Sequence, residues 1–456
     1  MMYRSRAKRP TTQLRRKAVR DGGRIDAAIR VLEDFGTRRV PLKVALADWA
    51  RGARYAGAKD RAFISGLALD VLRRQASLLA EGGGLRGAVA ICLRRHWEWP
   101  IVRIKEAYAE EPHGPDPLTE EEEEALQAAQ ASLEKKELHA IAPHDAANVP
   151  AFTWPFFSRV FQEPVDELNA FCARAPVDIR VNALKADPEK ATKALKPQGV
   201  GAAPFTQMGL RFAPPNADQR AVSVMATPAF QKGWVEVQDE GSHIAALAAG
   251  PLDGAQVLDF CAGGGGKTLA LAAMMENRGQ VYAYDQDAHR LAPIFERLKR
   301  AGARNVQVLS PAEGGDLSNL AGKMDLVVVD APCTGSGTWR RHPDTKWRLT
   351  PEQVERRMAE QDEVLAAAAQ YVKPDGHLLY VTCSLFAEEN EDRVDAFLEK
   401  HDEFCLTDAV VPIENSGGLK NVLKPFLLRD SSTIRLTPAQ HGTDGFTITR
   451  LHRRIL

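Results

Sequence analysis

The sequence predicts an α/β protein with a mostly parallel sheet covered by helices on both faces, preceded by an all-helical domain. Two observations support this fold class. From residue 236 onward, short apolar runs alternate with segments of helical periodicity, as in parallel strands joined by crossover helices. Residues 25–110 instead repeat apolar residues at three- and four-residue steps, which is typical of helices that pack together.

Composition narrows the class of protein further. The 456 residues include 60 Lys and Arg against 60 Asp and Glu, so a nucleic-acid surface would have to be a local patch. No run reaches the ~18 apolar residues of a membrane span, and the basic N-terminus lacks the apolar core of a secretory signal. The six cysteines stand singly, which favours a reducing cytoplasm over a disulfide framework or a zinc site.

The chain is expected to divide into four parts. Residues 1–24 contain nine Lys or Arg and one acid, so they form either a solvated disordered tail or a basic arm that contacts phosphates. Residues 25–145 form the helical domain, 146–235 a small α/β linking domain, and 236–456 the parallel-sheet domain.

The first two domains contain clear element signals. Thr119 and Glu122 have the spacing of a capping box, so a helix should begin there with the surrounding acids in its first turn. In the linking domain, "DIRVNALK" predicts a strand. A short helix should then start near Asp187 and end at Pro197 or Gly199.

In the sheet domain, strands and helices should alternate in regular order. The predicted strands are "QVLDF", "QVYAYD", "VQVLS", "MDLVVVDAP" and "HLLYVTCS". The predicted helices start at Lys267, cover "DAHRLAPIFERLKRAG", span 350–372 and lie at about 386–400. Two final segments, "STIRLTPAQ" and "GFTITRLHRR", are expected to form an antiparallel edge pair.

The turn after the first strand is a candidate binding site. Four consecutive glycines, 263–266, allow close approach of the backbone to a ligand, at the strand ends where open α/β sheets bind ligands. The spacing fits neither a P-loop nor G-x-G-x-x-G. Asp285 ends the second strand about 20 residues later, where an acid accepts hydrogen bonds from a ribose, although it could instead cap the next helix. Glycines and acid together favour NAD or S-adenosylmethionine.

Two cysteines at neighbouring strand ends distinguish these cofactors. Cys333 follows the fourth strand together with Asp330, and Cys383 follows the fifth. Hydride transfer does not use two thiols. Methylation of cytosine C5 can use them, because a thiolate that adds to C6 lets C5 attack a sulfonium methyl. A carboxyl group that donates a proton to N3 would stabilise the adduct, and Lys267 could lower a thiol pKa and orient the base. The alternatives are buried filler for the cysteines and an exposed first-turn residue for Lys267.

From about residue 233 to the end, the chain resembles the NOL/NOP/Sun family of RNA cytosine-5 methyltransferases, which includes the RsmB-type bacterial enzymes. The matching blocks are "VQDEGS", "DFCAGGGGKT", "VYAYDQDAHRL", "DAPCTGSGTWRRHPDTKW", "YVTCSLFAEEN" and "HGTDGF". The resemblance implies a Rossmann-like class I methyltransferase sheet with S-adenosyl-L-methionine as cofactor.

The resemblance also assigns site residues. It implies that Cys383 is the C6 nucleophile, that Cys333 assists adduct breakdown, and that Asp330 and Lys267 contact the cytosine. It places the cofactor at Cys261, Ala262, Gly263, Gly264, Gly265, Gly266 and Lys267, with Asp285 on the ribose and with Arg290 and Asp330 in the same site.

Two further resemblances cover the earlier domains, and two positions depart from the family pattern. Residues 25–80, above all "KDRAFISGLALDVLRR", resemble a NusB-like RNA-binding module, which implies that the basic arm contacts RNA; "FCARAPVDIRVNALKA" resembles the family's linking segment. Gly264 replaces the usual proline and loosens the turn. Pro311 lies near the usual adenosine-contacting acid, with Glu313 and Asp316 displaced.

The loop after Cys333 is the candidate RNA-binding segment. In "GTWRRHPDTKW", the cations Arg340, Arg341, His342 and Lys346 lie between two tryptophans, an arrangement that suits phosphates and stacked bases. The tryptophans could instead belong to the core. The target cytosine must leave its stack to reach a thiol, so a single-stranded loop or a flipped base is expected.

The sequence therefore predicts an RNA cytosine-5 methyltransferase, a transferase of one-carbon groups, with 16S ribosomal RNA as the favoured substrate and tRNA as the alternative. The expected protein is a cytoplasmic monomer that binds RNA and S-adenosyl-L-methionine, with no metal and no membrane. Two other classes are considered: a catalytically weak RNA-binding ribosome assembly factor with the same fold, and an NAD-dependent oxidoreductase.

Overall fold

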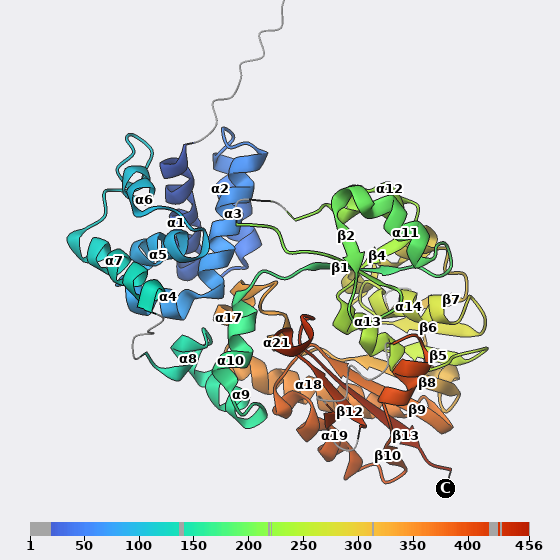
Figure 1. Cartoon of the computed structure of the whole chain (residues 1–456). Coiled ribbons are helices and arrows are strands. Elements are labelled where there is room, and N and C mark those ends of the chain that lie inside the picture. Colours follow the sequence, from blue (N-terminus) through green and yellow to red (C-terminus); the bar gives the residue numbers. More distant parts are fainter. Residues whose placement is uncertain are drawn as a thin grey trace, which may run out of the picture. The chain divides into compact units, whose positions relative to one another are not determined.

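The chain folds into two compact units. One contains most of residues 20–135, and the other contains residues 72–80 and nearly all of the chain from residue 141 onward (Figure 1). The computed structural model describes residues 20–135, 141–217, 219, 221–311, 314–418, 427–428 and 431–455. The predicted basic arm, 1–24, lies almost entirely outside the described residues, so its RNA contact stays a prediction.

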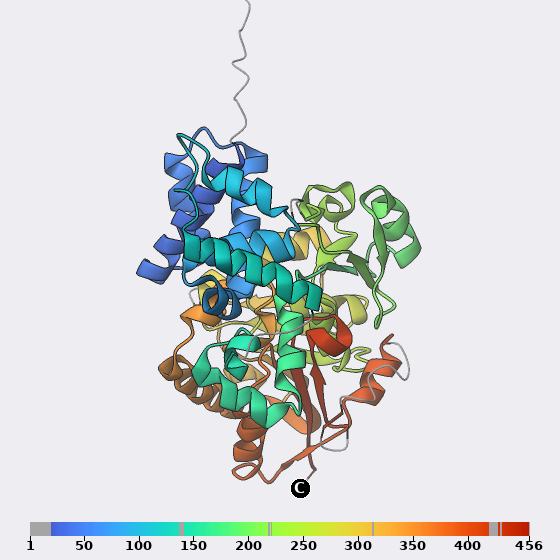
Figure 2. The ribbon, with the colours of Figure 1, turned by 60° about the vertical axis from the view of Figure 1, so that its left-hand side comes forward.

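The first unit consists of helices, drawn in blue to cyan in Figure 2. The capping box is confirmed: the Glu122 N–H donates to Thr119 Oγ1 (3.2 Å), and the Thr119 N–H donates to Glu122 Oε2 (3.0 Å). The segment "KDRAFISGLALDVLRRQASLLAEG" forms two helices that meet at Arg74. The helices from Asp21 to Lys135 are α1 (Asp21–Arg38), α2 (Leu42–Gly52), α3 (Ala58–Arg73), α4 (Gln75–Gly82), α5 (Leu85–His96), α6 (Ile101–Tyr108) and α7 (Glu120–Lys135).

The second unit contains a small antiparallel sheet, which precedes the main sheet along the chain. Its strand order is β2-β3-β1-β4, and β1 is the strand predicted from "DIRVNALK". The predicted short helix is α11, whose N-cap Asp187 accepts a hydrogen bond from the Lys190 N–H. The elements of this region are α8 (Pro143–Ala146), α9 (Trp154–Val160), α10 (Pro164–Asn169), β1 (Val177–Val181), α11 (Pro188–Leu195), β2 (Val200–Ala202), β3 (Gly209–Phe212), α12 (Pro228–Gln231) and β4 (Val235–Val237).

In the described residues, the main sheet has nine strands in the order β11-β12-β13-β9-β8-β5-β6-β7, with β10 paired to β13. The strands from β5 to β9 run parallel, as predicted. β12 and β13 pair antiparallel, as expected, but β13 also pairs with β9 and is therefore inside the sheet. The strands are β5 (Gln256–Asp259), β6 (Gln280–Tyr284), β7 (Val306–Leu309), β8 (Met324–Asp330), β9 (Val372–Thr382), β10 (Phe404–Leu406), β11 (Leu427–Leu428), β12 (Thr433–Leu436) and β13 (Phe446–Arg453).

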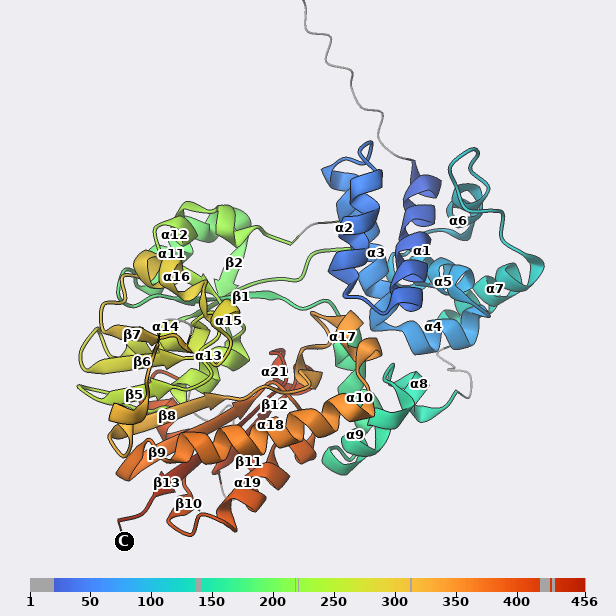
Figure 3. The same cartoon turned by 180° about the vertical axis from the view of Figure 1, so that it is seen from behind.

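Helices cover both faces of this sheet because strand side chains alternate between them. Val257 and Leu326 pack on the face of α13 and α14, whereas the adjacent Leu258 and Val327 pack on the face of α18 and α19. Figure 3 shows α18 and α19 lying across the strands. The helix predicted after β6 breaks at Pro293. The helices are α13 (Glu240–Leu247), α14 (Gly266–Met274), α15 (Ala288–Leu291), α16 (Ile294–Ala301), α17 (Pro343–Arg348), α18 (Pro351–Ala369), α19 (Glu391–Leu398), α20 (Val410–Asn415) and α21 (Pro438–His441).

Strand order reverses at β5, which lies between β6 and β8. The carboxyl ends of β5, β6, β8 and β9 meet at one edge of the sheet, which is where ligands bind in open α/β folds. In the part of the chain that the structure describes, no single helix has the length and apolarity to cross a membrane, although the bent pair α4 and α5 would pass on these criteria together.

Candidate active site

The glycine-rich turn has the backbone conformation that its sequence suggests. Gly263 (φ 48°) and Gly265 (φ 81°) occupy the left-handed region, which favours glycine. A Cβ at Gly265 would lie 2.5 Å from Ile294 Cγ1, so the turn packs directly on α16. The carbonyl of Gly264 accepts a hydrogen bond from Arg297 Nη1. This contact restrains the turn at the position where the family usually has proline.

Asp285 connects the end of β6 to the glycine turn. Its Oδ2 accepts a hydrogen bond from the Gly263 N–H (2.9 Å), and its Oδ1 accepts one from the Asp287 N–H (2.9 Å). Arg290 Nη1 lies 3.6 Å from the same carboxylate. The N-cap of α15 is Asp287, so the alternative that Asp285 caps this helix is wrong. Asp285 therefore lies at the strand end, next to the turn, where the sequence predicted it.

Asp259 fixes the start of α14 through a hydrogen bond with Thr268. It ends β5, is completely buried, and accepts a hydrogen bond from Thr268 Oγ1 (2.6 Å). Burial raises the pKa of this carboxyl to about 7, and the hydrogen bond from Thr268 opposes the shift. The hydrogen bond links the last residue of β5 to the first turn of the helix and so orients Lys267.

Lys267 and Asp330 form an ion pair at the carboxyl ends of β5 and β8. Lys267 Nζ lies 2.7 Å from Asp330 Oδ2, with the lysine side chain 5% exposed and the aspartate side chain 37% exposed. The ammonium also lies 5.5 Å from the centroid of the Phe446 ring. The alternative of a solvent-exposed lysine is therefore wrong. The partly exposed carboxylate can meet a substrate while the buried cation holds it in place.

The two predicted thiols touch. Cys333 Sγ and Cys383 Sγ are 3.4 Å apart, on the loops that follow the parallel neighbours β8 and β9. Both cysteines are free and partly buried. The hydrogen bond to Cys383 and burial both raise the pKa of Cys333 well above its ordinary value. The two thiols therefore lie together at the carboxyl ends of β8 and β9.

A buried carboxyl next to these loops, Glu389, was not anticipated from the sequence. Its oxygens accept hydrogen bonds from the Thr334 N–H (2.8 Å) and from the hydroxyls of Thr334 (2.5 Å) and Ser384. Thr334 follows Cys333 and Ser384 follows Cys383. The only signal in the sequence was the position of Glu389 in "YVTCSLFAEEN", close to Cys383.

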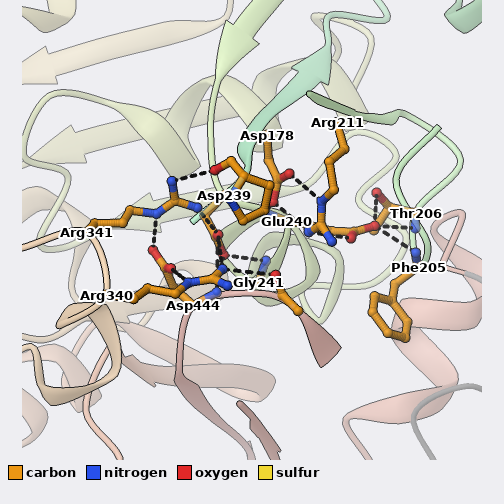
Figure 4. Close-up of polar contacts among 12 residues, drawn as sticks. Asp178, Phe205, Thr206, Arg211, Asp239, Glu240, Gly241, Arg340, Arg341 and Asp444 are labelled. Atoms are coloured by element: carbon orange, nitrogen blue, oxygen red, sulfur yellow. Dashed lines mark hydrogen bonds and ion pairs between the residues drawn. The ribbon is translucent and has the colours of Figure 1, made fainter. Parts of the chain in front are cut away.

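Two of the four cations predicted to contact RNA belong to a buried ion-pair cluster (Figure 4). Arg340 Nε donates to Asp444 Oδ1 (2.7 Å), and Arg341 Nε donates to Asp444 Oδ2 (2.5 Å). Arg341 Nη2 also donates to Asp239 Oδ2 (2.7 Å). Arg340 is 4% exposed, so its guanidinium stabilises the fold here; this corrects the expectation that it contacts RNA.

Lys346 and both tryptophans of this loop are also structural. Lys346 is 2% exposed and donates to the carbonyl of Arg73 (3.0 Å), so the prediction that it contacts RNA is wrong for this conformation. Trp347 Nε1 donates to the carbonyl of Leu72 (2.7 Å), and Trp339 is buried in an aromatic cluster. The core alternative for the tryptophans holds. The RNA contact of His342, which is exposed, stays a prediction.

The strand order and the glycine turn with Asp285 at the strand ends are those of a Rossmann-like sheet of the class I methyltransferase type. Within the described ranges, no group of three or more His, Cys, Asp or Glu side chains could hold a metal ion. Residues 246–452 match the model of the family described as 16S rRNA methyltransferase RsmB/F.

Individual relatives agree with the family match. The chain is 31% identical over 291 residues to ribosomal RNA small subunit methyltransferase B of Photorhabdus laumondii (63% of this chain, 62% of the relative). It is 29% identical over 300 residues to the probable Synechocystis enzyme of that name (63% of each). The chain thus covers less than two thirds of these relatives. The crystal structure of PH0851 superimposes with a TM-score of 0.67 at 25% identity, over 95% of this chain and 99% of that one.

The cofactor of this fold and family is S-adenosyl-L-methionine, and the residues present fit it. The glycine turn offers close backbone approach, and the adjacent Asp285 carboxylate is already fixed by two N–H donors. A second structure, NSun6 from Pyrococcus horikoshii with SFG, shares the fold (TM-score 0.55, 22% identity, 67% of this chain and 99% of that one).

Proposed function

We propose that the protein is an RNA cytosine-5 methyltransferase that acts through a covalent bond between Cys383 and C6 of the target cytosine. The observation that carries this proposal is the 3.4 Å contact between the two sulfurs. A single nucleophile would need one thiol. A second thiol in contact with the first suits a reaction in which an adduct must form and then break down.

The residues have distinct roles in this proposal. Cys383 adds to C6 as a thiolate, while Cys333, whose pKa is raised, stays protonated beside it. Asp330 and Lys267 hold the pyrimidine edge and stabilise the charge that addition creates. S-adenosyl-L-methionine supplies an electrophilic methyl group for C5. A base takes the C5 proton, the electron pair of that C–H bond re-forms the C5=C6 double bond, and Cys383 leaves as the thiolate; Cys333 assists this release.

The cofactor-binding residues are part of the proposal. The turn from Cys261 to Lys267 would hold the cofactor, with Asp285 on the ribose and Arg290 beside it. The hydrogen bonds of Asp285 to Gly263 and Asp287 support this placement, because they orient the carboxylate at the strand end.

Ribosomal RNA of the small subunit is the proposed substrate. The family description and the names of the relatives support this choice over tRNA. A flipped or single-stranded cytosine is required, because a thiol cannot reach C6 of a stacked base. Bisulfite sequencing of RNA from a deletion strain would identify the nucleotide and would distinguish the two RNA classes.

A single-turnover assay with labelled cofactor and total RNA tests the activity. We expect the wild type to transfer label to 16S RNA and Cys383→Ala to transfer none. RNA binding without transfer by the wild type would support an assembly factor instead. Stabilisation by nicotinamide cofactors, and not by S-adenosyl-L-methionine, would support an oxidoreductase.

A further inference from the structure

The carboxyl of Glu389 joins the two loops that carry the thiols. Glu389 is completely buried at the end of a short 3₁₀ turn just before α19. Its Oε1 accepts from the Thr334 N–H (2.8 Å) and from Gln361 Nε2 (2.9 Å). Its Oε2 accepts from Thr334 Oγ1 (2.5 Å) and from Ser384 Oγ. Four donors therefore fill the four acceptor positions that a carboxylate offers.

Glu389 contacts each loop at the residue that directly follows the cysteine. Thr334 follows Cys333 and Ser384 follows Cys383, so the carboxyl bridges the two loops next to their sulfurs. Further along, the Gly337 N–H donates directly to the Cys383 carbonyl (2.9 Å). The anchor is itself fixed, because the Glu389 carbonyl accepts from the Tyr380 hydroxyl (2.8 Å). The loops belong to different strands, and a hydrogen-bonded bridge between them restrains their relative motion.

We propose that Glu389 is a positioning residue that keeps Cys333 and Cys383 in contact. It acts through Thr334 and Ser384, whose backbones continue into the loops that carry the sulfurs. The span of the side chain is the property that matters. The four hydrogen bonds that Glu389 accepts are what joins the two loops. The catalytic consequence rests on the proposed function, whereas the thiol contact itself does not.

Phenylarsine oxide reports the thiol contact without any methyl transfer. Arsenic forms bonds to two sulfurs only where two thiols lie side by side, and the two thiol protons leave with its oxygen as water. We expect the full-length wild type to retain one equivalent against a monothiol wash and to release it to a dithiol. Cys333→Ala should retain none, which controls for the cysteines that stand alone.

Two substitutions separate span from charge. Glu389→Asp keeps the charge but shortens the side chain by one methylene, so we expect capture to slow by about tenfold or more. Glu389→Gln keeps the span, because its oxygen can accept from Thr334 and its NH₂ can donate to the hydroxyls, so it should capture at close to the wild-type rate. The matched control is Glu388→Gln on the adjacent residue, which pairs with Arg159 (2.9 Å) and should change nothing.

The outcomes decide the proposal. The proposal is overturned if Glu389→Asp captures phenylarsine oxide at the wild-type rate. It is also overturned if Glu389→Gln loses capture of phenylarsine oxide while Glu389→Asp retains it. If thermal melts show that Glu389→Asp is unfolded, Ser384→Ala takes its place, and unchanged capture there has the same meaning. With RNA present, Glu389→Asp should also accumulate a covalent protein–RNA adduct. Slow capture without an adduct would count against the proposed reaction and leave the role of Glu389 intact.

Discussion

Lys267 Nζ lies 2.7 Å from Asp330 Oδ2, and the two partners differ strongly in exposure, at 5% for the lysine side chain and 37% for the aspartate side chain. Loss of either partner should abolish methyl transfer, but the two losses should differ in stability. Removal of the carboxylate leaves a buried cation without its partner. Removal of the lysine leaves a carboxylate that water can reach.

Asp330→Asn should therefore destabilise the fold by about 1–3 kcal/mol, below the usual cost of breaking a fully buried pair because Asp330 is partly exposed. Lys267→Met, which keeps an apolar stem, should stay within about 1 kcal/mol of the wild type. Urea unfolding at constant m-value measures both. Equal destabilisation by the two variants would contradict the asymmetric burial of the pair.

Cys333→Ala should trap a covalent protein–RNA adduct, because addition by Cys383 survives while release is impaired. The adduct should appear as a slowed band on a denaturing gel of protein incubated with RNA and S-adenosyl-L-methionine. The double variant that also carries Cys383→Ala is the control and should form none. If Cys333→Ala gives no slowed band, the division of roles between the two thiols is wrong.

Asp285→Asn should weaken binding of S-adenosyl-L-methionine by about tenfold or more, because an amide loses one of the two carboxylate acceptors. Isothermal titration with the purified protein measures the change. The control is Asp287→Asn, which keeps an acceptor at the N-cap of α15 and should bind the cofactor normally. Normal affinity in Asp285→Asn would remove this residue from the cofactor site.

Lys346→Met should stabilise the fold near neutral pH. Burial lowers the pKa of Lys346 from 10.5 to about 8, so the folded protein carries a penalty of about 3 kcal/mol wherever the group is charged in both states. The Arg73 carbonyl keeps a partner in the variant, because Cys172 Sγ also contacts it (3.3 Å). We expect a net gain of about 1–3 kcal/mol after loss of the lysine hydrogen bond.

The gain should depend on pH. Below pH 8 the lysine is charged in both states and the penalty is complete; between pH 8 and 10.5 the folded state loses its proton first and the penalty disappears. Thermal melts of wild type and Lys346→Met across this range should therefore converge as pH rises. A constant difference would show that packing, not charge, sets the stability of this position.

Local pattern was sufficient for most of the sheet domain. The alternation of apolar runs and helical segments predicted β5 to β9 because each pattern depends only on neighbours in sequence. The site followed from the same information. Parallel strands end at one edge, so residues placed just after β5, β6, β8 and β9 had to meet there. The helix break at Pro293 was missed because the apolar periodicity of the whole segment was given more weight than the single proline within it.

The sequence by itself determined which segments form the parallel strands. It therefore also determined that Lys267, Asp285 and the two thiols follow those strands at one edge of the sheet. Only the tertiary structure decided which charged groups are buried. Arg340 and Lys346 read as surface cations, yet they are buried against Asp444 and the Arg73 carbonyl. Nothing in the sequence marked Glu389 except its position close to Cys383. Burial of a charge depends on partners, and those partners come from segments far away in the sequence.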